Sequence, residues 1–242
     1  MIYVTGDTHG CPERLSENNI RNINKKYNID FPVPGSGDTL IIAGDFGCVW
    51  NKYGKAEYWL DWLAEKPYTT VFCDGNHEDF NLLYSYPVKL WNGGLVHEIR
   101  PNIFHLMRGE IFTIEDKTFF IFGGAESVDR KYRTEGISWW KEEVCSADEI
   151  INAKHNLEKV NYTVDYVITH TSPKRFLYNR GKFIFDKPIF FTTCPVMEFL
   201  SEIEQKMNYT KWFFGHFHKD LNNRNMKCRA IYTDLTIINY YH

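Results

Sequence analysis

The sequence predicts an α/β fold with an antiparallel component, and three observations support that prediction. Five short, continuous runs rich in Val, Ile, Phe and Tyr are each followed by a small polar cluster, a pattern typical of buried strands. Segments with apolar residues at helical spacing lie between several of these runs. In mid-chain, four shorter alternating segments follow one another with only tight turns between them, which indicates antiparallel pairing.

The expected strands fall into three groups along the chain. The buried strands are expected at Met1–Val4, Thr39–Ala43, Thr69–Cys73, Tyr166–Ile168 and Lys211–Phe214. The mid-chain antiparallel run comprises Val96–Ile99, Ile103–Leu106, Ile111–Ile114 and Thr118–Phe122. At the end of the chain, Cys228–Tyr232 and Thr236–Asn239 are expected to form a closing hairpin.

Four helices are expected between these strands. They are predicted at Pro12–Tyr27, Ala56–Glu65, Ser146–Val160 and Met197–Met207. Pro67 ends the second helix, and Ser146 with Glu149 forms a capping box at the start of the third. Because no repeat or low-complexity linker divides the sequence, residues 1–242 are expected to form a single domain.

Composition and charge narrow the class of partner. Hydrophobic residues make up 43% of the 242 residues and charged residues 24%, which is typical of globular proteins. The net charge of −3 provides no overall field that would attract nucleic acid, so it disfavours a nucleic acid partner but leaves one open. No apolar run approaches the roughly 20 residues that a membrane-spanning helix needs, and no membrane partner is expected.

Cysteine usage and the start of the chain predict a cytoplasmic location. The six cysteines lie far apart and include no C-x-x-C pair, so they are expected to be core residues in a reducing compartment rather than disulfides. A strand and a ligand motif begin almost at Met1, which leaves no place for a signal peptide. The oligomeric state stays open.

Each of the five buried strands leads into a cluster of metal-type ligands. The clusters are Gly6–Gly10, Gly44–Gly47, Gly75–Glu78, Thr169–Thr171 and Gly215–His218. Ligands bind beyond the carboxyl ends of strands in α/β sheets, so five such ends can converge on one site. Any one Asp, Asn or His there is more often a turn or packing residue, and the prediction therefore rests on their occurrence together. Asp, His and Asn without Cys favour divalent ions such as Mn, Fe, Zn or Co.

The order and spelling of these motifs resemble those of the calcineurin-like metallophosphoesterase superfamily, from residue 6 to residue 218. The resemblance implies a four-layer α/β/β/α sandwich of two mixed sheets flanked by helices. It also implies a dinuclear centre with two divalent metal ions, both bridged by Asp45. By position in the motifs, one cation is expected at Asp7, His9 and His218, and the other at Asn76, His170 and His216.

The reaction expected from this resemblance is hydrolysis of a phosphoric ester by a metal-bridging hydroxide. Two divalent ions lower the pKa of water and neutralise phosphate oxygens. Two divalent ions, two carboxylates and one hydroxide together leave about one net positive charge to attract the phosphate. A third carboxylate in place of the neutral Asn76 would cancel that charge. His77 is the expected general acid for the departing alkoxide, and Glu78 or Asp79 is a candidate to orient it.

One departure from the family pattern concerns the grip on the phosphate. Protein Ser/Thr phosphatases of this superfamily follow the second motif with an Asp and an Arg, whereas here Asp45 leads into Phe46–Val49. This difference disfavours a protein phosphatase. Arg130 and Arg133, beyond the strand that ends at Phe122, are the candidate anion clamp because Arg matches phosphate in a bidentate manner. A solvated surface turn is an equal alternative for this stretch, and Arg175 or Arg180 would then be the next candidates.

Other functions compete with a small-molecule phosphatase. A phosphodiesterase or nuclease, or a hydrolase of dinucleoside polyphosphates, would use the same site, although no Lys-rich stripe supports a nucleic acid substrate. A binding scaffold without catalysis is a different class, and the presence of both His9 and His77 argues against it. The expected partner is a small phosphorylated substrate.

Overall fold

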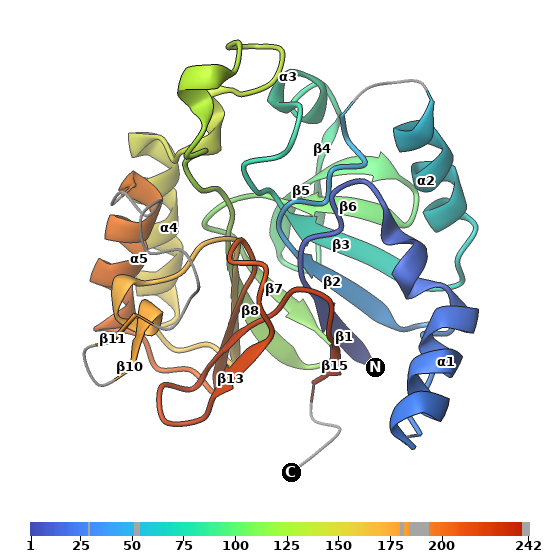
Figure 1. The fold of residues 1–242 in the computed structure, drawn as a ribbon. Helices are drawn as coiled ribbons and strands as arrows, with labels where there is room; N and C mark the ends of the chain where they lie inside the picture. The colour runs from blue at the N-terminus through green and yellow to red at the C-terminus, as the bar shows by residue number, and fades with distance from the viewer. Residues whose placement is uncertain (29, 51–53, 180–181, 184–193, 239–242) are drawn as a thin grey trace.

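Two mixed β-sheets packed face to face, with helices on the outer face of each, make up the computed structural model of this chain (Figure 1). It describes residues 1–28, 30–50, 54–179, 182–183 and 194–238. In Figure 1, α1 (Glu17–Tyr27) and α2 (Lys55–Ala64) lie on one side of the strands, while α4 (Ala147–Lys159) and α5 (Pro195–Glu204) lie on the other. The predicted four-layer α/β/β/α architecture is confirmed.

The first sheet has seven strands in the order β15-β1-β2-β3-β6-β5-β4. Their bounds are β1 Ile2–Thr5, β2 Thr39–Ala43, β3 Thr69–Cys73, β4 Val88–Trp91, β5 Gly94–Arg100, β6 Ile103–Leu106 and β15 Leu235–Ile237. The strands β1, β2, β3 and β6 pair in parallel, and antiparallel strands flank them on both sides.

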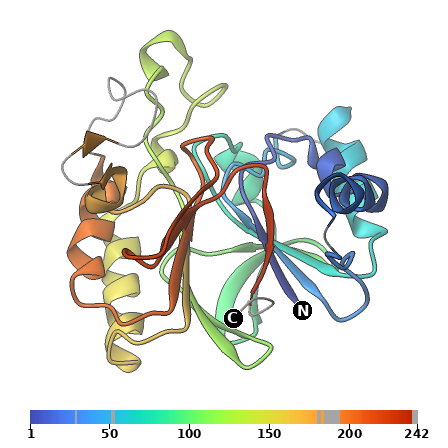
Figure 2. The same cartoon turned by 60° about the horizontal axis from the view of Figure 1, so that its bottom comes forward.

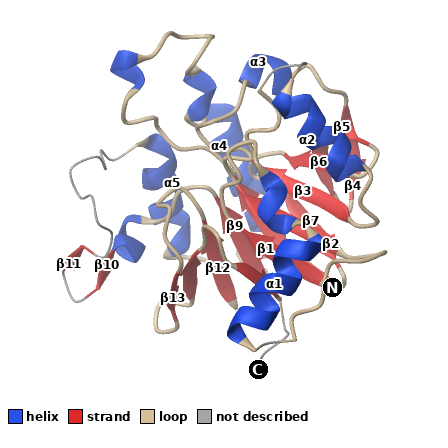
Figure 3. Cartoon of the chain, turned by 45° about the vertical axis from the view of Figure 1, so that its right-hand side comes forward, coloured by secondary structure: helices blue, strands red, loops and turns tan. Residues whose placement is uncertain are grey.

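The second sheet has six strands in the order β13-β14-β12-β9-β8-β7. Their bounds are β7 Ile111–Ile114, β8 Lys117–Phe122, β9 Tyr166–Thr169, β12 Lys211–Phe214, β13 Leu221–Asn223 and β14 Cys228–Ala230. Here too the inner strands are parallel and both edge strands are antiparallel. A separate small hairpin pairs β10 (Tyr178–Asn179) with β11 (Lys182–Phe183), away from both sheets (Figure 3).

Three apolar cores separate the four layers, and side chains of each inner strand alternate between two of them. In β2, Leu40 and Ile42 pack in the core under α1 and α2, while Ile41 faces the core between the sheets. In β8, Phe120 packs in the core under α4 and α5, and Phe119 faces the core between the sheets. Burial on both faces explains why these strands read as continuous apolar runs, and Figure 2 shows the outer helices on either side of them.

Two sequence-based expectations about pairing were wrong. The expected closing hairpin does not form, because β14 pairs with β12 and β13 in the second sheet whereas β15 pairs with β1 in the first. The mid-chain antiparallel run is split in the same way: β5 pairs with β6 in the first sheet, and β7 pairs with β8 in the second. Residues 239–242, including the predicted end of that hairpin, lie outside the described residues.

The helices agree with the expected ones except at the first. Residues Pro12–Leu15 form a 3₁₀ turn, and α1 begins after Ser16, whose extended backbone breaks the helical path and whose hydroxyl caps the Asn19 amide. Short helices not expected from the sequence are α3 Phe80–Leu83 and the 3₁₀ turns Arg130–Tyr132, Lys141–Glu143 and Lys174–Leu177. None of the helices within the described ranges combines the length and apolar character that a membrane crossing requires. All six cysteines are free thiols.

Candidate metal centre and active site

The seven expected metal ligands follow five parallel strands, and the structure brings their side chains to one place. Asp7 follows β1, Asp45 follows β2, Asn76 follows β3, His170 follows β9, and His216 and His218 follow β12. Four of the seven are almost fully buried: Asp7, Asp45, Asn76 and His170. The side chains of His9 and His218 are 31% and 49% exposed, so the site opens to solvent on their side.

The first ligand group consists of Asp7, His9 and His218. The Nε2 atoms of His9 and His218 lie 2.9 Å apart, and His218 Nε2 lies 3.2 Å from Asp7 Oδ2. With Asp45, these residues offer one ligand atom each, all within 4.8 Å of one another. Such a set of imidazole nitrogens and carboxylate oxygens suits a borderline divalent cation.

The second ligand group is built around His170. Its Nε2 lies 3.2 Å from Asn76 Oδ1 and 3.3 Å from Asp45 Oδ1. Its Nδ1 donates to the carbonyl of Ala43 at 3.1 Å, which leaves the Nε2 lone pair facing the two oxygens. His216 completes the group, with its ring centroid 4.9 Å from that of His170.

Asp45 lies between the two ligand groups and turns one oxygen toward each. Its Oδ2 is 3.8 Å from His9 Nδ1 in the first group, and its Oδ1 is 3.3 Å from His170 Nε2 in the second. The backbone amide of His77 donates to Oδ1 at 2.9 Å and so fixes the carboxylate plane. The two oxygens of this carboxylate thus face different groups of candidate ligands.

The orientation of Asn76 is set by Ser127, a residue that sequence reasoning missed. The Asn76 side-chain amide donates to Ser127 Oγ at 3.1 Å, so the Asn76 oxygen faces His170. The lone pairs of Asn76 Oδ1, Asp45 Oδ1 and His170 Nε2 then converge with no hydrogen between them. A cation would stabilise that arrangement, so the residues present fit a metal ion at this point.

The protonation states of the cluster also suit metal binding. Burial would raise the pKa of the Asp45 carboxyl, but the imidazoles of His170 and His77 outweigh it and lower the pKa to about 2. Burial lowers the pKa of His216 to about 3, with His170 acting in the same direction. Asp45 is therefore charged and His216 neutral at neutral pH, which are the forms that bind a cation.

Four of the seven ligands have left-handed backbones, with φ of 45° at His9, 45° at Asp45, 65° at His216 and 48° at His218. Non-glycine residues seldom adopt this conformation, and strain of this kind concentrates at functional sites. No sequence motif predicts this backbone conformation.

The glycines that precede several ligands provide space for the ligand side chains. A Cβ on Gly75 would lie 2.0 Å from Asp45 Oδ1, and a Cβ on Gly215 would lie 2.2 Å from Asp7 Oδ1. Each glycine therefore leaves room for a carboxylate from a neighbouring loop. Asp7 in turn accepts hydrogen bonds from the backbone amide of His216, at 3.1 Å to each carboxylate oxygen.

Two further side chains hold the ligand loops from outside. Arg14 donates to the carbonyls of Gly6, Asp7 and Tyr232, at 2.7–2.9 Å, and so ties the first ligand loop to the segment after β14. Glu78, a candidate to orient His77, instead accepts from the amides of Phe46 and Gly47 at 2.7 and 3.2 Å.

Asp79, the other candidate, caps α3 by accepting from the Leu82 amide at 3.0 Å. The side chain that reaches His77 in the structure is Arg133. Its Nη1 lies 3.4 Å from His77 Nδ1.

His77 and Arg133 form a pair beside the first ligand group. The His77 ring meets His9 edge to face, with centroids 5.3 Å apart. Because Arg133 can only donate, His77 Nδ1 is the acceptor and the ring hydrogen lies on Nε2. Burial lowers the pKa of His77. The Asp45 carboxylate acts to raise this pKa, and the Arg133 guanidinium acts to lower it further.

The two candidate phosphate-binding arginines are placed differently. Arg133 is only 19% exposed, and its Nε lies 2.8 Å from the Asp129 carboxylate, which fixes the guanidinium next to His77. Arg130 is 53% exposed and pairs with Glu126 at 2.5 Å. Of the further candidates, Arg175 pairs with Glu204, and Arg180 lies outside the described residues.

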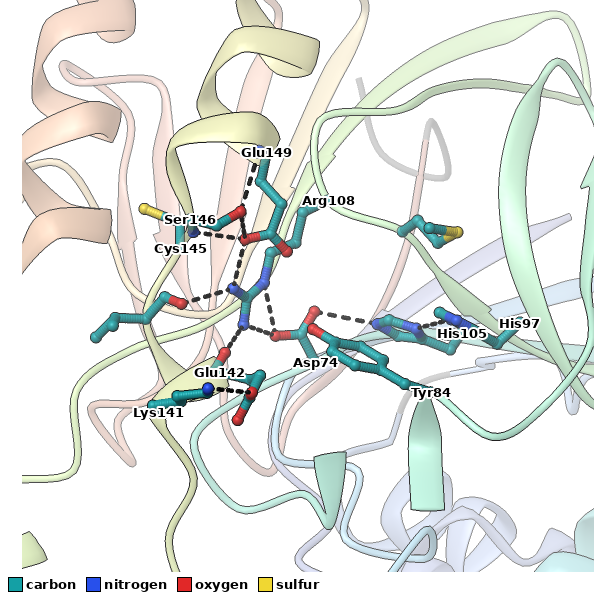
Figure 4. A pocket seen from close by; sticks show the side chains of 12 residues that line it. Asp74, Tyr84, His97, His105, Arg108, Lys141, Glu142, Cys145, Ser146 and Glu149 are labelled. Atoms are coloured by element: carbon teal, nitrogen blue, oxygen red, sulfur yellow. Dashed lines mark hydrogen bonds and ion pairs between the residues drawn. The ribbon is translucent and has the colours of Figure 1, made fainter. Parts of the chain in front are cut away.

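A second network surrounds Asp74, the residue that directly follows β3 (Figure 4). Arg108 binds both Asp74, at 2.9 Å from Nε, and Glu149, at 3.3 Å. On the other side, His105 Nε2 lies 3.0 Å from Asp74 and His105 Nδ1 lies 3.0 Å from His97. Burial would raise the pKa of Asp74, but Arg108 and His105 lower it overall. The network lines a cavity of about 530 Å³.

A family model described as calcineurin-like phosphoesterase matches residues 1–220. This chain belongs to the calcineurin-like phosphoesterase family. It is therefore a phosphoesterase, from a family that uses divalent metal ions, and the predictions of enzyme class and superfamily are confirmed. A search of curated proteins found no match.

Among solved structures, a phosphopantetheinyl hydrolase (PptH) from Mycobacterium tuberculosis is similar to this chain. The two are 13% identical, with a TM-score of 0.46, and the alignment covers 96% of this chain and 89% of the other.

Proposed function

We propose that this phosphoesterase hydrolyses a small phosphorylated substrate at a centre that holds two divalent cations. Asp7, His9 and His218 would hold one cation, Asn76, His170 and His216 the other, and Asp45 both. The observation that supports this proposal most strongly is the placement of Asp45, whose two oxygens face separate ligand groups at 3.8 and 3.3 Å.

The bound cations would supply a water molecule of lowered pKa and neutralise the oxygens of the substrate phosphate. The protein's own residues supply the remaining chemistry. His77, at the open side of the first ligand group, would pass its Nε2 hydrogen to the departing oxygen as general acid. Arg133 holds His77 in the tautomer that this transfer needs and is close enough to a phosphate bound beside His77 to contact it.

The charge of the buried site supports an anionic substrate. Asp7 and Asp45 provide two negative charges, and two divalent cations would outweigh them. Arg133 lies beside His77, where its charge is partly offset by its ion pair with Asp129. With no carboxylate where the neutral Asn76 stands, the two cations and two carboxylates alone leave a net positive charge of about two before water ionises.

The reducing interior of a cell is the location that best suits the six free thiols, and we propose a cytoplasmic enzyme. Residues 1–242 are proposed to act as a single domain, because ligands from residue 7 to residue 218 meet at one centre.

Turnover assays test the proposed function directly. The chelator-treated protein, reloaded with Mn²⁺, is expected to hydrolyse 4-nitrophenyl phosphate, and the metal-free protein is not. Bis(4-nitrophenyl) phosphate and a dinucleoside polyphosphate serve as parallel substrates, and a strong preference for the diester would favour the phosphodiesterase alternative. Hydrolysis that is undiminished after chelation, or no hydrolysis of any of the three with metal present, would contradict the proposal.

Replacing Arg133 is expected to weaken catalysis because its guanidinium lies next to His77. Arg130 instead pairs with Glu126 and, among the described residues, contacts neither His77 nor the expected ligands. Arg133→Ala should lower kcat/KM by about tenfold or more, on the scale of about 1.5–3 kcal/mol for hydrogen bonds to charged groups. Arg133→Lys should recover only part of the loss, because it keeps the charge without the planar fork.

Arg130→Ala is the matched control and should stay within about twofold of the wild type, or under 0.5 kcal/mol. Steady-state kinetics on the three variants decide the matter. Equal losses at both arginines would show that the segment acts only through its net charge.

A further inference from the structure

Two pockets flank the loops that carry the ligands, and their charges differ. The cavity beside Asp74 already contains balanced ion pairs, since Arg108 lies between Asp74 and Glu149 (Figure 4). The other pocket, of about 370 Å³, is lined by His9, Gly10, Gly47, Trp50, Lys55, Ala56 and His77. None of these described lining residues is a carboxylate, so this second pocket, here called the leaving-group pocket, has an excess of positive charge.

The leaving-group pocket opens on the side where the departing group must lie. A general acid stands next to the oxygen that it protonates, and His77 lines this pocket together with His9. The organic part of the substrate, beyond that oxygen, would therefore extend into the pocket. Its volume lies near the lower end of the range for small-molecule sites, which suits one ring system rather than a polymer.

Two further side chains that line the leaving-group pocket have complementary chemistry. Trp50 is half-buried, and an edge-to-face contact with the buried Trp140, at 5.5 Å between centroids, holds its ring. Lys55, at the start of α2, is exposed and forms no ion pair with a carboxylate in the part of the chain that the structure describes. An indole offers a stacking surface for a planar ring, and an unpaired ammonium offers a point charge for an anion.

Part of the pocket wall is formed by main chain. Gly10 and Gly47 approach so closely that a Cβ on Gly47 would lie 2.5 Å from the Gly10 nitrogen. Both have left-handed backbones, with φ of 68° and 67°. Because neither carries a side chain, the loops after β1 and β2 pack closely together at the wall of this pocket.

We infer that the leaving group of the natural substrate carries a planar ring, which packs against Trp50, and a second anionic group, which pairs with Lys55. A nucleotide is the chemical class that combines these two features in a molecule of this size. The inference rests on the proposed phosphoesterase function, because it places the leaving group by the position of His77.

Three substrates separate the two contacts. Hydrolysis of ribose 5-phosphate releases ribose, which has neither feature, and hydrolysis of AMP releases adenosine, which has the planar ring. Hydrolysis of ADP by one water molecule releases phosphate and AMP, and this AMP leaving group has both the planar ring and an anionic phosphate. For each substrate, kcat/KM of a variant is divided by that of the wild type, so that differences in intrinsic reactivity cancel.

Trp50→Leu is expected to lower kcat/KM for AMP and ADP about tenfold more than for ribose 5-phosphate, in the range known for stacking on aromatic side chains. Trp50→Phe should restore most of this loss, which separates stacking from a folding defect. Lys55→Met should lower kcat/KM for ADP about fivefold more than for AMP, a difference that shrinks at high salt. Trp62→Leu and Lys159→Met are the matched controls, and both should stay near the wild type.

The same losses on all three substrates would overturn the inference, as would hydrolysis of 4-nitrophenyl phosphate without hydrolysis of AMP or ADP. Either result would leave the proposed function standing. If the metal-loaded wild type hydrolyses none of these four compounds, this inference fails; the proposed function fails as well only if bis(4-nitrophenyl) phosphate and the dinucleoside polyphosphate are also left intact.

Discussion

Replacing Asp45 by Asn is expected to reduce both metal binding and turnover more than any other single change at the site. The amide keeps the shape of the side chain and can still accept from the His77 amide, but it lacks the charge and the second anionic oxygen that would hold two cations. Loss of an outer partner of a metal ligand costs about 10–100-fold, and the loss of a shared ligand should exceed that range. Metal content should fall below that of the wild type, and hydrolysis should fall to background.

Asp79→Asn is the matched control for this substitution. Asp79 lies nearby but caps α3, and Asn caps a helix about as well as Asp. Metal content and turnover of the control should therefore equal those of the wild type. A full complement of metal with near wild-type turnover in Asp45→Asn would show that Asp45 is a turn residue and not a bridge.

Replacing His77 by Ala is expected to slow turnover by about 10²–10⁴, the range for loss of a general acid, and to leave metal binding unchanged. The ring of His77 meets that of His9 edge to face, and His77 is not one of the seven expected metal ligands. Its main-chain amide, which supports Asp45, is retained in the variant. Titration with Mn²⁺ and steady-state kinetics would check the two halves of this prediction.

The leaving group provides the sharper test of His77. A 4-nitrophenolate departs without protonation, so the effect of His77→Ala should be much smaller with 4-nitrophenyl phosphate than with an alkyl phosphate. His155→Ala, at an exposed position on α4, is the control and should behave as the wild type. Equal losses with both substrates would assign His77 a positioning role instead.

Much of the architecture could be predicted from the sequence because the inner strands are buried on both faces. The bounds of β2, β3, β6, β7 and β12 match the expected ones. For β2, β3 and β12, a continuous apolar run that stops at a polar cluster leaves little freedom in placing the strand end. Which strands pair was harder to predict. The sheet that receives β15 depends on contacts with residues more than 200 positions away, such as the pairing of Tyr3 with Ile237, and local pattern carries no such information.

The same division applies to the site. Asp7, Asp45 and His170 could be identified because each directly follows a strand end or its glycine. The residues that orient the ligands could not. Ser127 reaches Asn76 across 51 positions, and Glu78 was expected near His77 but turns to the loop after Asp45.

The backbone conformation of the ligands could not be predicted from the sequence either. The positive φ at His216 depends on the loop geometry that surrounds it, which includes the hydrogen bonds from its amide to Asp7. A sequence motif can identify a residue that binds, but it does not show the strained backbone conformation that orients its side chain.

The central claim is that Asp45 joins two cation sites, and anomalous diffraction from crystals grown with Mn²⁺ tests it most directly. Two anomalous peaks are expected, about 3.5–4 Å apart, one bounded by His9 and His218 and the other by Asn76 and His170, with one Asp45 oxygen on each. A single peak in the first group, or two peaks that Asp45 does not touch, would contradict the account.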